Sequence, residues 1–469
     1  MFDFGFDDFD DSIREARLNE LVNRYEETGP SGYFDSEALE EIAGYYFDAG
    51  RFEAALDVID QLIDQHPYSS DAWMRRGIVL NNMGRHEDAL DAYDRALEQN
   101  PLDTESIVNR GITLDSLGEP EAALECFEKA LSVNPLHGEA LFNQGVTLER
   151  LDRLEAAADV FERCAEVQPN HPEVWYELGY CYDRLDKNEK SVACYDRHLD
   201  IDPYSQDAWY NRGIVLNRLG RYDDAVESYD MALAIQDDFA SAYYNRGNAL
   251  ANMGALDDAI ESYEQVLSIE GDDAATFFNI ALAYEELGDY QTGRTYYECA
   301  IEEDAAYPEA WYGLGCCYDA EGRFRRALEC FDRAIELRPR AAKFWKAKGD
   351  VSYNLGSLRA ALDAYERSTQ IDDTNRKTWL DYAEALFEAR RMEDALAAYR
   401  NALSLEPNCA GTYFRQAKAL LALGRSDESI RSLKKAFRLD PEKKKEFQYA
   451  YPDLYRNARV RRLLGLDHA

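Results

Sequence analysis

Positively charged residues, histidines and long hydrophobic runs are all scarce in this chain. Its 469 residues hold 52 Lys and Arg against 91 Asp and Glu, which gives a formal net charge of −39. Such an acidic surface repels the phosphate backbone of nucleic acids, so we expect no nucleic-acid partner. No apolar run approaches the roughly 20 residues that cross a membrane, so we expect no membrane partner either.

Motifs of catalytic and cofactor sites are also absent from the sequence. There is no G-x-x-x-x-G-K-[ST], H-E-x-x-H, G-x-S-x-G or dinucleotide-binding pattern. The six histidines are scattered, and carboxylates are so abundant that a chance pair has no meaning. We therefore predict a protein that is not an enzyme and that needs no cofactor or metal.

Cysteine usage and the N-terminal residues point to a cytoplasmic protein. The first residues, MFDFGFDDFDD, are acidic where a signal peptide is basic. The nine cysteines include no C-x-x-C, and several recur at equivalent helix positions. This pattern is typical of packing positions rather than of disulfides or metal ligands. Only the adjacent pair Cys316 and Cys317 leaves a redox role open.

What the sequence does contain is a strict period of 34 residues. Twelve units run from residue 36 to 443 without an insertion, and we number the positions of each unit as places 1 to 34. A period of this length is typical of stacked helical units that form a solenoid rather than one globular core. Place 4 holds a large apolar residue in every unit: Leu39, Trp73, Ile107, Leu141, Trp175, Trp209, Tyr243, Phe277, Trp311, Trp345, Trp379 and Tyr413. Place 8 holds a small residue in every unit: Ala43, Gly77, Gly111, Gly145, Gly179, Gly213, Gly247, Ala281, Gly315, Gly349, Ala383 and Ala417.

Each unit contains two amphipathic helices. In residues 206–239 one apolar stripe runs from Trp209 to Leu216, and a second follows a turn and runs from Ala225 to Ala232. Alanine is common at places 20 and 27, which lets the two helices approach closely, and proline ends several second helices. An aromatic residue at place 24 fills the space beside the alanines: Tyr93, Phe127, Phe161, Tyr195, Tyr229, Tyr263, Tyr297, Phe331, Tyr365 and Tyr399.

This pattern resembles that of the tetratricopeptide repeat (TPR) family, whose W-x2-L-G-x2-Y, A-x3-F and P positions have the same spacing. The resemblance implies an all-α, right-handed TPR superhelix of helix-turn-helix repeats that acts as a non-catalytic protein–protein interaction scaffold. We expect three segments. An acidic Phe/Asp tail with a short helix occupies 1–35, twelve TPR units occupy 36–443, and a basic C-terminal capping helix occupies 444–469.

Some units depart from the family pattern. His198 and Val266 replace a small residue at place 27, and Gly293 replaces alanine at place 20. Four units carry arginine rather than leucine at place 7, namely Arg76, Arg110, Arg212 and Arg246. We expect these changes to loosen or alter local helix contacts without changing the fold.

The resemblance also implies a binding face. In TPR proteins the first helices line a concave groove, so places 2, 5, 6, 9, 12 and 13 are the candidate contact positions. An amide is both donor and acceptor, so a ladder of asparagines can pair with the backbone of an extended peptide. Alternatively, asparagines persist through duplication of one unit or bond a neighbouring turn. Place 6 carries five of them, interrupted once by Glu177: Asn109, Asn143, Asn211, Asn245 and Asn279.

Two further rows accompany the asparagines. The aromatic residues at place 5 either offer a ligand contact area with a polar tip or pack between repeats. The arginines at place 13 either engage ligand carboxylates or neutralise acidic neighbours such as Glu149 and Asp183. The aromatic row is Phe142, Tyr176, Tyr210, Tyr244, Phe278 and Tyr312, and the arginines are Arg150, Arg184 and Arg218.

One specific ligand is disfavoured by the sequence. The carboxylate clamp of chaperone-binding TPR domains needs basic and amide side chains at fixed places. Lys346 and Arg415 fit this requirement, but Asp350, Asp381 and Gly411 occupy other required positions. Acidic side chains there would repel a C-terminal carboxylate, so we expect no chaperone-tail receptor.

We therefore predict a scaffold that binds an extended segment of another protein or peptide along the groove of units three to nine. A self-assembling structural scaffold or homo-oligomer, or a regulatory subunit of a separate enzyme, stays open as an alternative. Residues 342–469 hold 24 Lys and Arg against 18 Asp and Glu, whereas the rest is strongly acidic. Either the charge is a solvated surface, or this basic third meets an acidic partner such as the tail residues Phe2, Phe4, Phe6 and Phe9.

Overall fold

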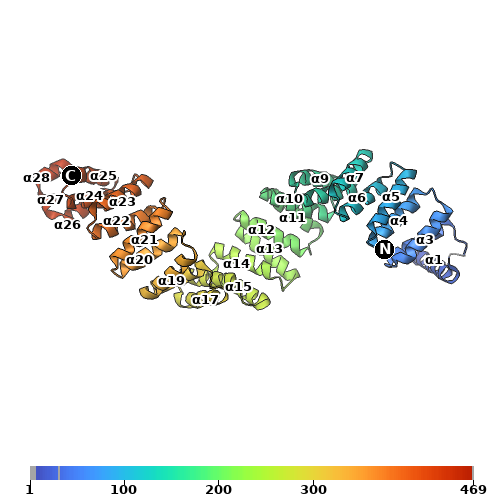
Figure 1. Cartoon of the computed structure of the whole chain (residues 1–469), viewed down its shortest axis with the longest axis horizontal. Coiled ribbons are helices and arrows are strands. Elements are labelled where there is room, and N and C mark those ends of the chain that lie inside the picture. The colour runs from blue at the N-terminus through green and yellow to red at the C-terminus, as the bar shows by residue number, and fades with distance from the viewer. Residues whose placement is uncertain (1–6, 30–31, 467–469) are drawn as a thin grey trace, which may run out of the picture. The chain divides into compact units, whose positions relative to one another are not determined.

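The structure is a computed structural model that describes residues 7–29 and 32–466. Within these ranges it contains 28 helices and no strand (Figure 1), so the prediction of an all-α solenoid is confirmed. Of the N-terminal tail, Phe2, Phe4, Phe6 and the Phe9 side chain lie outside the described part. The helices are α1 (Asp7–Thr28), α2 (Ser36–Asp48), α3 (Phe52–Gln65), α4 (Ser70–Asn82), α5 (His86–Gln99), α6 (Thr104–Ser116), α7 (Pro120–Val133), α8 (Gly138–Arg150), α9 (Leu154–Val167), α10 (Pro172–Arg184), α11 (Asn188–Ile201), α12 (Gln206–Arg218), α13 (Tyr222–Ile235), α14 (Ala240–Met253), α15 (Leu256–Glu270), α16 (Ala274–Glu286), α17 (Tyr290–Glu303), α18 (Pro308–Ala320), α19 (Phe324–Leu337), α20 (Ala342–Asn354), α21 (Leu358–Ile371), α22 (Arg376–Glu388), α23 (Met392–Leu405), α24 (Ala410–Ala422), α25 (Ser426–Leu439), α26 (Lys443–Ala450), α27 (Pro452–Arg456) and α28 (Ala458–Leu464).

The chain divides into two compact bodies, Met1–Asp237 and Asp238–Ala469. In both bodies every unit forms a helical hairpin, whose first helix begins at place 1 and whose second begins at place 17. Within each body, the first helices of neighbouring units also contact one another: α4 with α6, α6 with α8 and α8 with α10 in the first body, and α16 with α18, α18 with α20 and α20 with α22 in the second. We call the surface that these first helices form the first-helix face of each body.

Tryptophan at place 4 closes the turn between repeats. The indole N–H of Trp209 donates to the carbonyl oxygen of Pro203 at 2.9 Å. All six tryptophans of the chain occupy place 4, and each makes this bond to the residue six positions earlier, at 2.8 to 3.0 Å. The bond ties the start of each first helix to the preceding turn, so this place favours a residue that is both large and a hydrogen-bond donor.

Glycine at place 8 makes room for the aromatic ring at place 24 of the same unit. A Cβ atom on Gly213 would lie 2.5 Å from the ring of Tyr229, and one on Gly77 would lie 2.4 Å from the ring of Tyr93. All eight glycines at this place would meet their ring at 3.0 Å or less. The ring is therefore in direct contact with the backbone of the first helix.

In the eighth unit, glycines at other places make room for the aromatic ring and for the close approach of the two helices. Its place 8 is Ala281, and the ring of Tyr297 lies against the next unit, where a Cβ on Gly313 would be 2.2 Å from that ring. A Cβ on Gly293 would be 3.1 Å from the carbonyl oxygen of Ala281. The departure at Gly293 thus lets the second helix approach the backbone of the first one.

The arginines at place 7 bind aspartates of the preceding unit. In Arg212, Nε lies 2.6 Å from Asp196 Oδ1, and the guanidinium lies over the ring of Trp209. Equivalent ion pairs at 2.8 Å join Arg76 to Asp60 and Arg110 to Asp94. These substitutions therefore do not loosen the packing, because an ion pair between repeats replaces the apolar contact.

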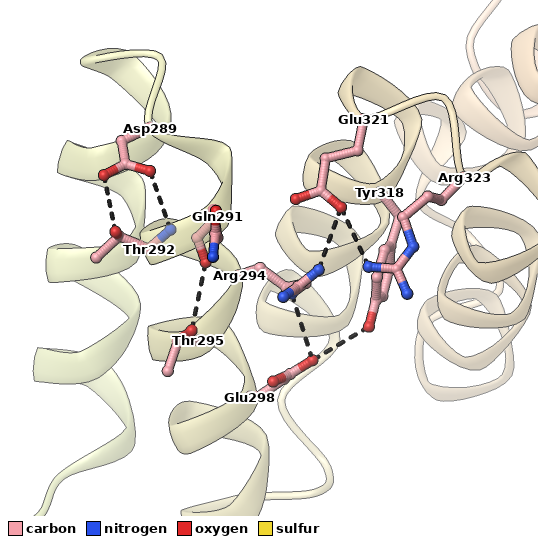
Figure 2. Close-up of polar contacts among 9 residues, drawn as sticks. All are labelled: Asp289, Gln291, Thr292, Arg294, Thr295, Glu298, Tyr318, Glu321 and Arg323. Atoms are coloured by element: carbon pink, nitrogen blue, oxygen red, sulfur yellow. Dashed lines mark hydrogen bonds and ion pairs between the residues drawn. The ribbon is translucent and has the colours of Figure 1, made fainter.

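Polar contacts also link a second helix to the following repeat, as Figure 2 shows for α17 and α18. Arg294 of α17 donates to the carboxylate of Glu321 at 3.1 Å. At the start of α17, the Asp289 carboxylate accepts hydrogen bonds from both the backbone N–H and the hydroxyl of Thr292, at 3.1 and 2.7 Å. This cap satisfies an N–H group that has no partner within the first helical turn.

The C-terminal segment, which was expected to form one capping helix, is divided into α26, α27 and α28. Pro452 begins α27, and the Asn457 side chain caps α28. Phe447 of α26 and Leu464 of α28 are buried in one cluster with Phe437 of the last repeat. Three short helices therefore cover the apolar end of the array, since proline interrupts a single continuous helix.

All nine cysteines are free thiols. Those at places 10 and 23 are buried, in agreement with a packing role. Burial raises the pKa of the Cys316 and Cys317 thiols to about 12, and the carboxylate of Glu285 adds to both shifts. Both thiols are thus held in the unreactive protonated form, which disfavours a redox role for this pair.

We predict that Gly213→Ala destabilises the protein by about 1–2 kcal/mol, because the new methyl group collides with the Tyr229 ring and outweighs the gain in helix propensity. Gly44→Ala is the matched control, since Gly44 lies in α2 with open space around it. We expect this control to be neutral or stabilising by up to about 1 kcal/mol. Urea unfolding followed by circular dichroism measures both changes, and equal effects would contradict the packing account.

Candidate functional site

The first-helix face is cross-linked by polar contacts between successive repeats. Because each unit has 34 residues, two residues that are 35 positions apart occupy consecutive places, such as 5 and 6, in successive units. Five hydrogen-bonded pairs have this separation: Arg150 with Asp115, Asn211 with Tyr176, Arg218 with Asp183, Asn279 with Tyr244, and Tyr353 with Glu388. The predicted rows at places 5, 6 and 13 therefore contact one another or their neighbours inside each body.

Two of the predicted asparagines pair with the predicted tyrosines. Asn211 Nδ2 donates to the hydroxyl oxygen of Tyr176 at 2.9 Å, and Asn279 Nδ2 donates to that of Tyr244 at the same distance. Both asparagines are half-buried. Each amide is therefore held by a side chain on the first helix of the preceding repeat, and not by the neighbouring turn that the sequence left open as an alternative.

The other asparagines of place 6 have different surroundings. Asn109 and Asn143 are half-buried and donate to the carbonyl oxygen four residues earlier on their own helices, at 3.0 and 2.8 Å. Asn245 occupies the same place of α14 and is also half-buried. The five amides thus share a register but not a common hydrogen-bond pattern.

The aromatic row at place 5 packs against the rings at place 24. Ring centroids of the six pairs lie 5.7 to 6.1 Å apart. Phe278 and Tyr312 also contact an aromatic ring at the next repeat boundary, with centroids 5.1 Å apart in each case. The row therefore packs mainly within its own repeats, Tyr312 with Phe344 joins two repeats, and all six rings are half-buried.

The arginines at place 13 are paired with acidic residues of the chain itself. Arg218 lies 2.5 Å from a carboxylate oxygen of Asp183, and Arg184 lies 3.1 Å from one of Asp152. Arg150 donates to the carbonyl oxygen of Asp115 and also pairs with its carboxylate. These arginines neutralise the acidic face, as one of the two sequence interpretations proposed.

Glu177, which interrupts the asparagine row at place 6, forms a pair with Glu149 of the preceding unit. Burial raises the pKa of Glu177 to about 8, and the charge and hydrogen bond of Glu149 and the charge of Glu173 add to the shift. Burial also raises the pKa of Glu149, although a hydrogen bond from Glu177 and the charge of Arg184 oppose this. A carboxyl pair that holds a proton near neutral pH thus lies on the first-helix face, and the sequence indicated it only as an exception to the row.

The second body carries a mixed-charge pocket of about 450 Å³ on its first-helix face. Lys346 Nζ lies 2.6 Å from Asp350 and 3.3 Å from Asp381, and the Tyr365 hydroxyl donates to Asp350 at 2.9 Å. The pocket is lined by Lys346, Asp350, Tyr353, Asn354, Tyr365, Lys377, Asp381, Glu384 and Arg415. The lysine that a carboxylate clamp requires is thus neutralised by two internal carboxylates. The sequence had grouped Lys346, Asp350, Asp381 and Arg415 as an imperfect carboxylate clamp, but it did not indicate that Tyr365 of a second helix joins them.

In the described part of the chain, no group of three or more histidine, cysteine, aspartate or glutamate side chains has the arrangement of a metal site. None of the helices in residues 7–29 and 32–466 is both long enough and apolar enough to cross a bilayer.

Sequence profiles of one family match most of the chain. Profiles described as tetratricopeptide repeat or TPR repeat match residues 41–104, 108–166, 160–193, 194–227, 215–254, 240–273, 274–307, 308–340 and 380–444. Together with the helical hairpins that begin at places 1 and 17, this shows that the chain belongs to the tetratricopeptide repeat family. As a class, such repeat arrays are protein-interaction scaffolds.

Several solved structures are similar to the chain. YrrB, described as a TPR protein with an unusual peptide-binding site, is 23% identical over 39% of this chain and 95% of its own, with a TM-score of 0.36. MamA from Desulfovibrio magneticus RS-1 is 22% identical over 36% and 96%, with a TM-score of 0.34. A chain of Naa15/Naa10 bound to HypK-THB is 15% identical over 92% and 82%, with a TM-score of 0.36. No curated protein matches the sequence.

We predict that stability falls between about pH 5 and about pH 8.5 more steeply in the natural protein than in Glu177→Gln. Folding raises the pKa of Glu177, so the folded state keeps a proton that the unfolded chain releases, and rising pH favours unfolding in this window. We expect a difference of about 1 kcal/mol, because one pKa unit is about 1.4 kcal/mol and solvent screens a half-buried group.

The measurement is urea unfolding at several pH values. Glu155→Gln, at an exposed position of α9, is the matched control and should keep the pH dependence of the natural protein. Parallel stability curves for Glu177→Gln and the natural protein would show that the carboxyl pair is not protonated in the folded state.

Proposed function

We propose that the first-helix face of each body binds an extended segment of another protein. The observation that supports this most is the pairing of half-buried amides with tyrosine hydroxyls, at Asn211 with Tyr176 and at Asn279 with Tyr244. In the first body the proposed contact set lies on α6 to α12, and in the second body it lies on α14 to α18.

The pairing prepares these asparagines to read a peptide backbone. One proton of Asn211 Nδ2 is committed to Tyr176, which fixes the plane of the amide and the direction of Oδ1 and of the second N–H. A side chain that is already ordered loses less entropy when it binds a ligand. The peptide backbone can then bond to one acceptor, the amide oxygen, and to one donor, the second amide N–H. This contact does not depend on the side chains of the peptide.

Charge selects the kind of peptide that the first body accepts. Arg150, Arg184 and Arg218 already pair with carboxylates of the chain, so they are poor sites for an acidic ligand. The remaining surface of this part of the sequence is strongly acidic. We therefore propose that the ligand is a neutral or basic segment, and that long-range attraction speeds its association at low salt.

We predict that Asn211→Ala, Asn245→Ala and Asn279→Ala together weaken peptide binding by at least about tenfold. Each lost backbone hydrogen bond contributes about 0.5–1.5 kcal/mol, and about 1.4 kcal/mol is a factor of ten in affinity. Peptides selected by display on the full-length protein supply the ligands, and fluorescence anisotropy measures the affinities.

The control is a second triple variant in exposed turns between repeats, with Asn100→Ala, Asn170→Ala and Asn408→Ala. It should bind as the natural protein does. Tyr176→Phe with Tyr244→Phe separates the two roles, because it keeps the rings and removes the hydroxyls that accept from the asparagines. If all three variants bind equally well while circular dichroism shows intact helices, the amides serve the fold alone.

Self-assembly is a second candidate function, and a separate row of exposed apolar residues favours it. Tyr68, Leu102, Leu136 and Tyr204 occupy place 33 in the turns between repeats of the first body, and they are 81%, 65%, 68% and 81% exposed. Each follows a proline that ends the preceding second helix. Exposed apolar rows of this kind are typical of protein–protein contact surfaces.

We predict that Tyr68→Ser with Tyr204→Ser lowers the average mass measured by light scattering if copies of the chain associate through this row. The natural protein should then show a mass that rises with concentration, whereas the variant should not. Tyr33→Ser with Tyr449→Ser is the matched control, because these tyrosines are 91% and 92% exposed but lie outside the row. A natural protein that stays monomeric at all concentrations would exclude this assembly.

A further inference from the structure

Cys409 differs from the other cysteines in its position. It is half-buried and is the N-cap residue of α24, at place 34 in the turn between two repeats. Six of the nine cysteines are buried, and the half-buried Cys299 and Cys316 lie inside α17 and α18. Cys409 is therefore the half-buried thiol that lies at the positive end of a helix dipole.

A carboxylate is one of the groups that occur at this place, at Asp103 and Asp273. At place 34 of the seventh unit, the carboxylate of Asp273 accepts from the backbone N–H and the hydroxyl of Thr276, at 2.7 and 2.8 Å. Asp289 and Thr292 form the same arrangement at the start of α17 (Figure 2). A residue with a hydroxyl three positions after the N-cap thus forms, together with its own N–H, a two-donor site for an anion.

Cys409 and Thr412 have the same spacing, but a thiol stands where the carboxylate would be. In the part of the chain that the structure describes, the hydroxyl oxygen of Thr412 is buried and has no hydrogen-bond partner, and this side chain is 1% exposed. A buried hydroxyl without a partner is costly. A thiolate at Cys409 would accept from it and would complete the cap as aspartate does elsewhere.

Neighbouring charges act on the same atom. The Arg376 guanidinium of α22 donates to Cys409 Sγ at 3.6 Å, and it also pairs with Glu406 at 2.7 Å. Burial opposes ionisation, but the hydrogen bonds that a thiolate would accept from the hydroxyl and N–H of Thr412, together with the charge of Arg376, outweigh burial and the charge of Glu406 and lower the pKa of the Cys409 thiol below its ordinary value. Cys299 contrasts with this, because burial and the charges of Glu302, Asp272 and Glu298 raise its pKa.

We propose that Cys409 is a reactive thiolate site that exchanges with low-molecular-weight disulfides and so takes a reversible S-thiol modification. The thiolate sulfur attacks one sulfur of the reagent, the S–S bond of the reagent breaks, and its other half leaves as a thiolate. A reducing thiol reverses the exchange by the same route. The modification would place a new group beside the Arg376 and Glu406 ion pair in the turn before α24.

The test is the reaction of the folded full-length protein with an aromatic disulfide that releases a coloured thiolate. We expect one thiol to react in a fast phase at neutral pH, peptide mass mapping to assign it to Cys409, and the pH midpoint of the rate to lie below that of an ordinary thiol. Cys409→Ser, which keeps a good N-cap residue, should lose the fast phase. Cys299→Ser is the matched control and should keep it.

Variants at Thr412 test the proposed cause. Thr412→Val keeps the shape of the side chain and removes the hydroxyl, so the pH midpoint should rise and the rate at neutral pH should fall about threefold for each unit of that rise, since higher basicity partly offsets the smaller thiolate fraction. Thr412→Ser should restore both values. A fast phase that persists in Cys409→Ser, equal rates at Cys299 and Cys409, or an unchanged midpoint in Thr412→Val would each overturn the proposal.

Discussion

The contact between the bare Cα at place 8 and the aromatic ring at place 24 is the constraint on which the rest of the array depends. A ring that touches the backbone sets the separation of the two helices in a hairpin, and hairpins of equal separation stack with an equal step. In the two terminal units both places change together, since Ile59 and Leu433 replace the ring where Ala43 and Ala417 replace the glycine. The eighth and eleventh units keep the rings of Tyr297 and Tyr399 beside alanine at place 8. An unbroken period of 34 residues follows, since an insertion would change the step and break the cross-links between neighbours.

The equal step between repeats also determines where the few arginines of this acidic chain form ion pairs. Arginines at places 7 and 13 recur beside aspartates of the adjoining unit, so equivalent ion pairs form in several units. Most of these pairs are partly exposed, and exposed pairs contribute little to stability individually. Under the proposed function their main effect would be on recognition, because paired arginines leave an acidic surface that favours neutral or basic segments over acidic ones.

The polar groups of the first-helix face and of the turns follow one rule, in which a side chain is oriented by a neighbouring repeat or by the first turn of the helix that follows it. Asn211 is oriented by Tyr176, and the N-cap carboxylates are oriented by the hydroxyl three residues later. The cap at Cys409 has both donors in place for an anion and a thiol in place of the acid. The proposed peptide binding and the proposed reactivity of one thiol would therefore both use polar sites that the repeats have already ordered.

The sequence by itself determined the architecture. The period, the small residue at place 8, the aromatic residue at place 24 and the tryptophans at place 4 are local patterns, and a helix and its turn are decided within about one unit. Only the tertiary structure decided what the polar residues do. The partner of Arg212 is 16 residues away, and that of Asn211 is 35 residues away in another unit. Burial and the neighbouring Glu149 raise the pKa of Glu177, and no residue pattern displays this effect. Periodicity sets which face a residue lies on, whereas its hydrogen bonds and charge state depend on atoms that the stacking of repeats brings within about 3 Å.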